Sequence, residues 1–151
     1  MAENETARCE LRPAIAADAG WLEALYEDAM RPHVEAVGAW DPDLFRLTFD
    51  PRTTQVVRHD GRDVGMLRTV PRQDGLYLAD IQLDASHRRR GIGSRILKQL
   101  IAESERTGRA LILRCLRGNP ARRFYERHGF KVYKSSPDAW FLWRRAGTPQ
   151  E

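Results

Sequence analysis

The change of hydrophobic period after Ser86 is the feature that most constrains the fold. Residues 76–83 predict a strand, but from Ile92 the apolar side chains recur as on one face of an amphipathic helix, which Gly108 then ends. Residues 110–116 form a nearly continuous apolar run, which is typical of a buried strand. Because a helix that joins two strands of one sheet makes a crossover, this order predicts a parallel strand pair.

The rest of the chain predicts an antiparallel meander before this unit and further strands after it. The turn His59-Asp60-Gly61 separates two strand-like runs, as in a hairpin. Asn119 and Pro120 are the residue types that begin a helix, as N-cap and first helical position. The other expected elements are a strand at 9–12, a helix from Asp18 with Trp21, Leu22, Leu25, Tyr26 and Ala29 on its apolar face, one or two short helices within 31–51, and strands at 130–133 and 140–144.

Size and charge narrow the possible functions. The 151 residues fit a single domain, 1–151, with short frayed tails at 1–7 and 146–151. Residues 1–85 carry a net charge of −7, whereas residues 86–131 carry +10. This asymmetry suggests two different ligands, one cationic and one polyanionic.

Cysteine usage and the N-terminus predict the compartment. The two cysteines, Cys9 and Cys115, form no CxxC pair and have no histidine at zinc-site spacing, so we expect free thiols and no metal. The first residues lack the apolar run of a signal peptide, and no stretch approaches transmembrane length. We therefore expect a cytoplasmic protein with no membrane partner.

The segment Arg88-Arg89-Arg90-Gly91-Ile92-Gly93-Ser94 lies between a strand and the first turn of a helix, and its chemistry is anion binding. Glycines let the backbone approach a ligand, a helix start presents unpaired N–H groups, and arginines add positive charge. A pyrophosphate fits such a loop. A dinucleotide fingerprint would need glycine at Ile96, and no GxxxxGK[ST] is present, so nicotinamide and ATP sites are disfavoured.

Two motifs together resemble the GNAT superfamily of acyl-coenzyme A-dependent N-acetyltransferases. Arg88-x-x-Gly91-x-Gly93 is similar to its first signature, and the run from Asn119 through Tyr125 to Gly129-Phe130 looks like its second. The resemblance implies an α/β (α+β) fold: a mixed, mostly antiparallel sheet of six to seven strands, with a parallel splayed pair in the middle and about four flanking helices. It also implies acetyl-coenzyme A as co-substrate, and small proteins of this kind are often homodimers.

The resemblance assigns cofactor-binding roles to the strand before the loop and to the loop itself. Asn119, near the splayed strand end, has two candidate roles, cofactor ligand and N-cap, and these are compatible. The residues expected to bind the cofactor are Ile81, Gln82, Leu83, Arg88, Arg89, Arg90, Gly91, Ile92, Gly93, Ser94 and Asn119.

Attack of an amine on a thioester needs an uncharged nitrogen, stabilisation of the oxyanion and a proton for the leaving thiolate. Tyr125 is the expected acid, since in the family the matching tyrosine lies beside the sulfur; the alternative is a packing role. Asp80 and Asp84 fall on one face of the strand and are candidate bases, or simply strand-end acids in solvent. Backbone N–H groups of residues 81–83 would meet the oxyanion. Cys115 lies in a buried strand, which argues against an acyl-cysteine route.

The acceptor is expected to be a small-molecule or peptide amine held by the segment after the first helix. Glu35, Trp40 and Asp41 there offer an aromatic and carboxylate pocket for an ammonium, although a tryptophan in a short helix is more often core. Two other functions stay open. One is a catalytically silent acyl-coenzyme A sensor. The other is a basic nucleic-acid-binding module. The arginines have no aromatic residues interleaved with them for base stacking, which argues against this function, so we expect no nucleic-acid partner.

Overall fold

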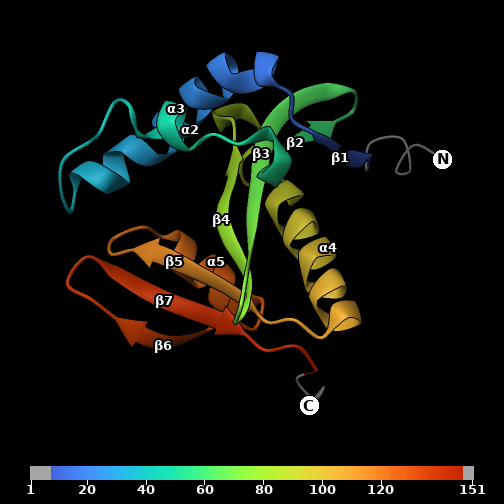
Figure 1. Cartoon of the computed structure of the whole chain (residues 1–151), viewed down its shortest axis with the longest axis vertical. Coiled ribbons are helices and arrows are strands. Elements are labelled where there is room, and N and C mark those ends of the chain that lie inside the picture. Colours follow the sequence, from blue (N-terminus) through green and yellow to red (C-terminus); the bar gives the residue numbers. More distant parts are fainter. Residues whose placement is uncertain (1–7, 148–151) are drawn as a thin grey trace.

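The computed structural model describes residues 8–147, and their seven strands form one sheet in the order β1-β2-β3-β4-β5-β7-β6 (Figure 1). Neighbouring strands are antiparallel except β4 and β5, which are parallel. The predicted fold class is confirmed. The strands are β1 (Cys9–Pro13), β2 (Thr54–His59), β3 (Arg62–Arg72), β4 (Gly75–Leu83), β5 (Leu111–Leu116), β6 (Lys131–Ser135) and β7 (Ala139–Arg144), and the α-helices are α2 (Ala19–Glu35), α3 (Leu44–Thr48), α4 (Ile92–Thr107) and α5 (Ala121–Arg127).

Two local predictions need correction. Helix α2 continues past Pro32 to Glu35, whereas the sequence predicted that residues 31–51 form a connection with one or two short helices. Arg31 pairs with Glu27 and with Glu35, and these i,i+4 ion pairs bridge the proline turn. Of the tails predicted at 1–7 and 146–151, residues 1–7 and 148–151 lie outside the described residues. Gly147 is not frayed, because its N–H donates to the Glu105 carboxylate at 2.6 Å.

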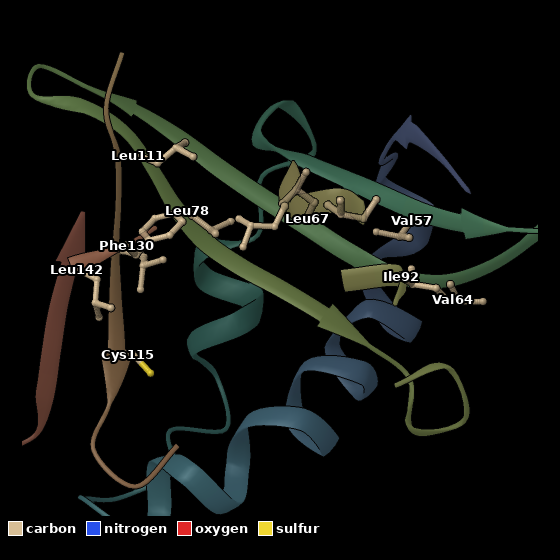
Figure 2. Close-up of a cluster of buried hydrophobic side chains, with 12 residues drawn as sticks. Val57, Val64, Leu67, Leu78, Ile92, Leu111, Cys115, Phe130 and Leu142 are labelled. Atoms are coloured by element: carbon tan, nitrogen blue, oxygen red, sulfur yellow. The ribbon is translucent and has the colours of Figure 1, made fainter. Parts of the chain in front are cut away.

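The sheet carries a hydrophobic core on each face. One core lies under α4 and α5 and runs from Val57 of β2 to Leu142 of β7 (Figure 2). The other lies under α2 and α3 and contains Leu22, Phe45 and Met66. The expected apolar face of the first helix is thus confirmed. Because both faces are covered, a site can open only where the sheet itself separates.

The sheet separates between β4 and β5. These strands pair at only three positions, from Leu76 opposite Leu111 to Leu78 opposite Leu113. Beyond that point β5 and its neighbours turn away from the direction of β3 and β4 (Figure 1). Next to the last pair, the register of β3 and β4 shifts by one residue, which leaves Ala79 as a β-bulge.

The bulge changes which face each β4 side chain occupies. Leu76 and Leu78 pack in the core under α4, and so do Ile81 and Leu83, although an uninterrupted strand would put these two pairs on opposite faces. Asp80 therefore points to the α2 face, where it meets Arg68 of β3. A buried carboxylate is placed at the point where the two strands part.

Candidate active site

The separation of β4 and β5 opens a pocket of about 540 Å³. One wall is β4 from Tyr77 to Gln82, and the opposite wall is β5 from Leu113 to Leu116. Helix α5 contributes Tyr125, and α2 covers the other side with Tyr26 and Met30. Of the residues predicted to be functional, Asp80, Ile81, Gln82, Arg88, Asn119 and Tyr125 line this pocket.

Asp80 is a buried carboxylate with 7 % of its surface exposed. Arg68 donates from Nε to its Oδ2 at 3.2 Å. Burial raises the pKa of Asp80 to about 6, and the nearby Arg68 and Gln82 lower it only in part. A carboxylate with this pKa is largely ionised at neutral pH yet more basic than an ordinary aspartate, which suits proton acceptance.

Tyr125 reaches the pocket from the face opposite α2. Its ring packs against Phe124 and Phe130, with ring centroids 5.3 and 5.7 Å away. Burial raises the pKa of the phenol, and the nearby Cys115, Asp80 and Tyr77 raise it further. The hydroxyl therefore keeps its proton at neutral pH and is a donor, as expected of the acid in the predicted mechanism.

Cys115 adjoins Tyr125 but is a poor nucleophile. Burial raises the pKa of its thiol above the ordinary value, so the thiolate is disfavoured at neutral pH. The prediction against an acyl-cysteine route agrees with this environment.

The glycine-arginine loop begins α4, as predicted. Gly91 has a φ of 81°, a left-handed conformation that favours glycine, and immediately precedes the helix. Ile92 is a core residue with 3 % of its surface exposed, so only its backbone can face a ligand. A Cβ placed on Gly91 would meet no atom within 4 Å, so open space lies beside the loop.

The three arginines of the loop differ in their contacts. Arg88 donates from Nε to the Leu83 carbonyl at 2.9 Å and pairs with Asp28 of α2 at 3.3 Å, so it ties the loop to β4 and α2. Arg90 donates to the Ser86 carbonyl at 3.3 Å. Arg89 is exposed. The loop's charge toward a ligand would therefore come mainly from Arg89 and Arg90, with backbone N–H groups of the helix start.

Ser94 and His128 link the loop to α5. His128 Nδ1 lies 2.8 Å from the Phe124 carbonyl, and its Nε2 lies 2.8 Å from the Ser94 hydroxyl. A carbonyl only accepts, so Nδ1 carries a proton, and the Ser94 hydroxyl can either donate to Nε2 or accept from it. Sequence reasoning missed this link because the two residues are far apart in the chain.

Asn119 is the predicted N-cap of α5. Its Oδ1 accepts the Ala121 N–H at 2.9 Å, and it also lines the pocket, so its two expected roles are compatible. Gly93 lies near Phe124 and Leu83, where the loop approaches α5 and the end of β4. Ile81 and Leu83 pack their side chains in the core, so only their backbone groups can serve a ligand.

Asp84 is placed elsewhere. It follows β4 and caps the short 3-10 helix Ala85–His87, accepting from the His87 N–H at 3.1 Å and from the Ser86 hydroxyl at 2.9 Å. Its carboxylate also lies 2.7 Å from His87 Nδ1. Asp84 is not part of the pocket lining, so the structure brings only one of the two candidate bases to the site.

The predicted ammonium cage is not assembled. Glu35 pairs with Arg31, and the Asp41 carboxylate accepts the Asp43 N–H at 3.0 Å. Trp40 packs on Tyr26 with ring centroids 5.7 Å apart, and the Arg31 guanidinium lies 5.8 Å from its centroid. None of the three residues lines the pocket. The wall on this side is made by residues that sequence reasoning missed: Tyr26, Met30, His33, Val34, Val37, Leu44, Arg68 and Arg114.

Comparison with known families identifies the chain. A family model described as an acetyltransferase (GNAT) domain matches residues 50–132, which span β2, β3, β4, the loop, α4, β5 and α5. The chain therefore belongs to the GNAT acetyltransferase family, a group of acyl-coenzyme A-dependent transferases. A search of curated proteins by sequence finds no match.

Solved structures agree on the fold. PaiA N-acetyltransferase from Thermoplasma acidophilum, in complex with coenzyme A, superposes with a TM-score of 0.75 at 14 % identity, covering 91 % of this chain and 99 % of that one. The ribosomal-protein-S18-alanine N-acetyltransferase from Escherichia coli gives 0.72 at 20 % identity, covering 95 % and 97 %. N-acetylglutamate synthase from Neisseria gonorrhoeae gives 0.68 at 17 % identity, and there this chain covers 36 % of the longer protein.

Two features are absent from residues 8–147. No helix in that range is long and apolar enough to span a bilayer. No cluster of three or more histidine, cysteine, aspartate or glutamate side chains in that range is arranged to hold a metal ion.

Proposed function

We propose that this protein transfers an acetyl or other short acyl group from acyl-coenzyme A to a primary amine by direct attack on the thioester. The observation that carries the proposal is the opening between β4 and β5, which holds a buried carboxylate and a protonated phenol in one pocket. The pocket lining includes Arg88 of the glycine-arginine loop and Asn119, the predicted N-cap of α5. Coenzyme A is also bound in the structures of two proteins of this fold, PaiA and N-acetylglutamate synthase.

The cofactor side of the pocket has the donors that a pyrophosphate needs. Backbone N–H groups at the start of α4, together with Arg89 and Arg90, would hold the phosphates. Residues 81–83 and Asn119 would flank the thioester end. When bound, acyl-coenzyme A supplies the activated acyl group.

Two side chains of this chain would manage the protons. Asp80 would accept a proton from the incoming ammonium, directly or through water, to give the attacking amine. Tyr125 would donate its phenolic proton to the departing thiolate and be reprotonated, directly or through water, by the proton that the attacking nitrogen loses as the amide forms. Backbone N–H groups of residues 81–83 would stabilise the oxyanion. Asp80 and Tyr125 line the same pocket, and the Asp80 carboxylate raises the pKa of the Tyr125 phenol. Asp84 is not needed in this scheme.

Calorimetric titration with acetyl-coenzyme A at two salt concentrations, followed by thiol release with a panel of amines, tests the proposal. We expect micromolar binding, weaker at high salt, and release that depends on the amine. Binding without release for any amine would favour the acyl-coenzyme A sensor. Absence of binding, together with salt-sensitive binding of RNA or DNA, would favour the nucleic-acid module. Homodimerisation and a cytoplasmic location stay predictions.

A further inference from the structure

The Arg114 guanidinium is a charged group in the pocket for which the proposed reaction has no role. Arg114 lies on β5, is exposed and lines the pocket. The other two arginines of the lining are already engaged, Arg68 with Asp80 and Arg88 with Asp28. Within residues 8–147, by contrast, no hydrogen bond or ion pair is formed by the Arg114 side chain.

Arg114 faces the same side of the sheet as Asp80. Its neighbours Leu113 and Cys115 pack in the core under α4 and α5, so strand alternation directs Arg114 to the α2 face. The Tyr26 phenol on α2 is affected by both groups: burial raises its pKa, Asp80 raises it further, and Arg114 lowers it. Asp80 and Arg114 therefore both act electrostatically on one phenol, on the side of the opening away from α5.

The wall above these charges is mainly apolar, although His33 of α2 also lines the pocket. Met30 and Val34 of α2, Val37 just after it and Leu44 of α3 line this part of the pocket. Asp138, in the turn between β6 and β7, is the other acid of the lining and is exposed. Its backbone carbonyl accepts the Arg117 N–H just past the end of β5, so Asp138 belongs to the rim at that end.

We propose that Arg114 binds a carboxylate on the acceptor, so that the substrate is an apolar amino acid whose amine is presented to Asp80. This rests on the proposed acyl transfer. An arginine fork pairs with a carboxylate through two parallel hydrogen bonds, which fixes orientation as well as charge. A polyamine, in contrast, would place a second ammonium against Arg114. The acidic first half of the sequence suggested such a cation, but its carboxylates at 35 and 41 lie outside the pocket.

Matched acceptors provide the first test. Thiol release is measured with leucine, methionine and phenylalanine, with the amines that remain after their decarboxylation, and with their methyl esters. We expect kcat/KM to be roughly ten- to a hundredfold higher for the amino acids, the worth of a charged hydrogen-bonded pair. The esters are a stringent control, because their less basic amines are more often uncharged and would react faster if the carboxylate were not recognised.

Variants provide the second test. Arg114→Gln should raise KM for the amino acid about tenfold or more, leave kcat nearly unchanged and leave the decarboxylated amine unaffected. Arg114→Glu should reverse the preference toward the amine. Arg62→Gln, an exposed arginine at the start of β3 and outside the pocket, is the matched control and should change neither constant. Unchanged acetyl-coenzyme A binding verifies that each variant is folded.

The outcomes separate this inference from the proposed function. Equal use of amino acids and decarboxylated amines, or equal loss of both in Arg114→Gln, would overturn the carboxylate site while leaving acyl transfer intact. Thiol release with the decarboxylated amines but not with the amino acids would also overturn the carboxylate site and leave acyl transfer intact. Failure of every acceptor with cofactor bound would instead contradict the proposed acyl transfer, and the acceptor site with it.

Discussion

The two sides of the pocket are built in different ways. The cofactor side consists mainly of backbone groups from one continuous segment, the loop at 88–94 and the helix start that follows it. The acceptor side consists of side chains from four elements: α2, α3, β3 and β5. The first side depends on the conformation of a short peptide, and the second on how distant elements pack.

This difference separates what the two sides can determine. Backbone N–H groups at a helix start recognise any phosphate, so the loop indicates a cofactor class but no acceptor. Side chains such as Arg114 and Met30 can change without altering the fold, so the acceptor side sets specificity. Variants on one side should therefore affect one substrate's binding and spare the other's.

Tyr125→Phe should have the largest effect. Removing the phenolic proton should lower kcat by about a hundredfold or more, as loss of a general acid does, while acetyl-coenzyme A binds nearly as before. Steady-state kinetics and calorimetry measure the two quantities. Tyr133→Phe, on the exposed strand β6, is the matched control and should be neutral. Unchanged turnover in Tyr125→Phe would show that another group supplies the proton.

Asp80→Asn should lower kcat/KM by about a hundredfold and change its pH dependence. Because Asp80 has a pKa of about 6, wild-type activity should fall as the pH drops through that value and the carboxylate is protonated. The variant should lack this acid limb. A limb near pH 6 that persists in Asp80→Asn would assign it to a different group.

The same residue should affect stability with the opposite dependence on pH. The pKa of Asp80 is raised from 3.8 to about 6, so between these values the folded state holds more protons than the unfolded state. Stability should therefore decrease as the pH rises across this window. Thermal melts of wild type and Asp80→Asn between pH 4 and 7 should differ in slope, and parallel curves would contradict the burial of an ionised Asp80.

Gly91→Ala should have a moderate effect confined to the cofactor. A left-handed residue with a Cβ costs roughly 1–2 kcal/mol, so the Kd for acetyl-coenzyme A should rise about tenfold while the acceptor KM is nearly unchanged. Gly20→Ala, in α2 with open space around it, is the control and should be neutral or stabilising. A larger change in acceptor KM than in cofactor Kd would break the division between the two sides.

Glu35→Gln and Asp41→Asn should have the smallest effects. Both carboxylates are exposed and lie outside the pocket, so acceptor KM should stay within about twofold of wild type. Initial-rate kinetics with the best acceptor measures this. A several-fold increase in acceptor KM would show that the acceptor binds the segment after α2, as the sequence suggested.

The difference between the two sides also explains what could be predicted from sequence. The crossover, the parallel pair and the loop depend on local spacing and on the glycine at position 91, and these predictions agree with the structure. The acceptor side depends on Arg68 and Arg114, which come from strands 46 residues apart and show no local pattern. Asp84 satisfies the same alternation as Asp80, and only the end of β4 at Leu83 distinguishes them.

The bulge at Ala79 has a consequence for how this chain can vary. The turn between β3 and β4 should tolerate changes in length, because its residues Gln73 and Asp74 are exposed. Deletion of Ala79 itself would restore simple alternation and direct either Asp80 or Leu78 to the wrong face. The site thus forms only when β4 keeps its number of residues around the bulge, whereas substitutions there adjust a site that is already formed. Insertions or deletions between Leu78 and Ile81 should be the least tolerated changes in the strand.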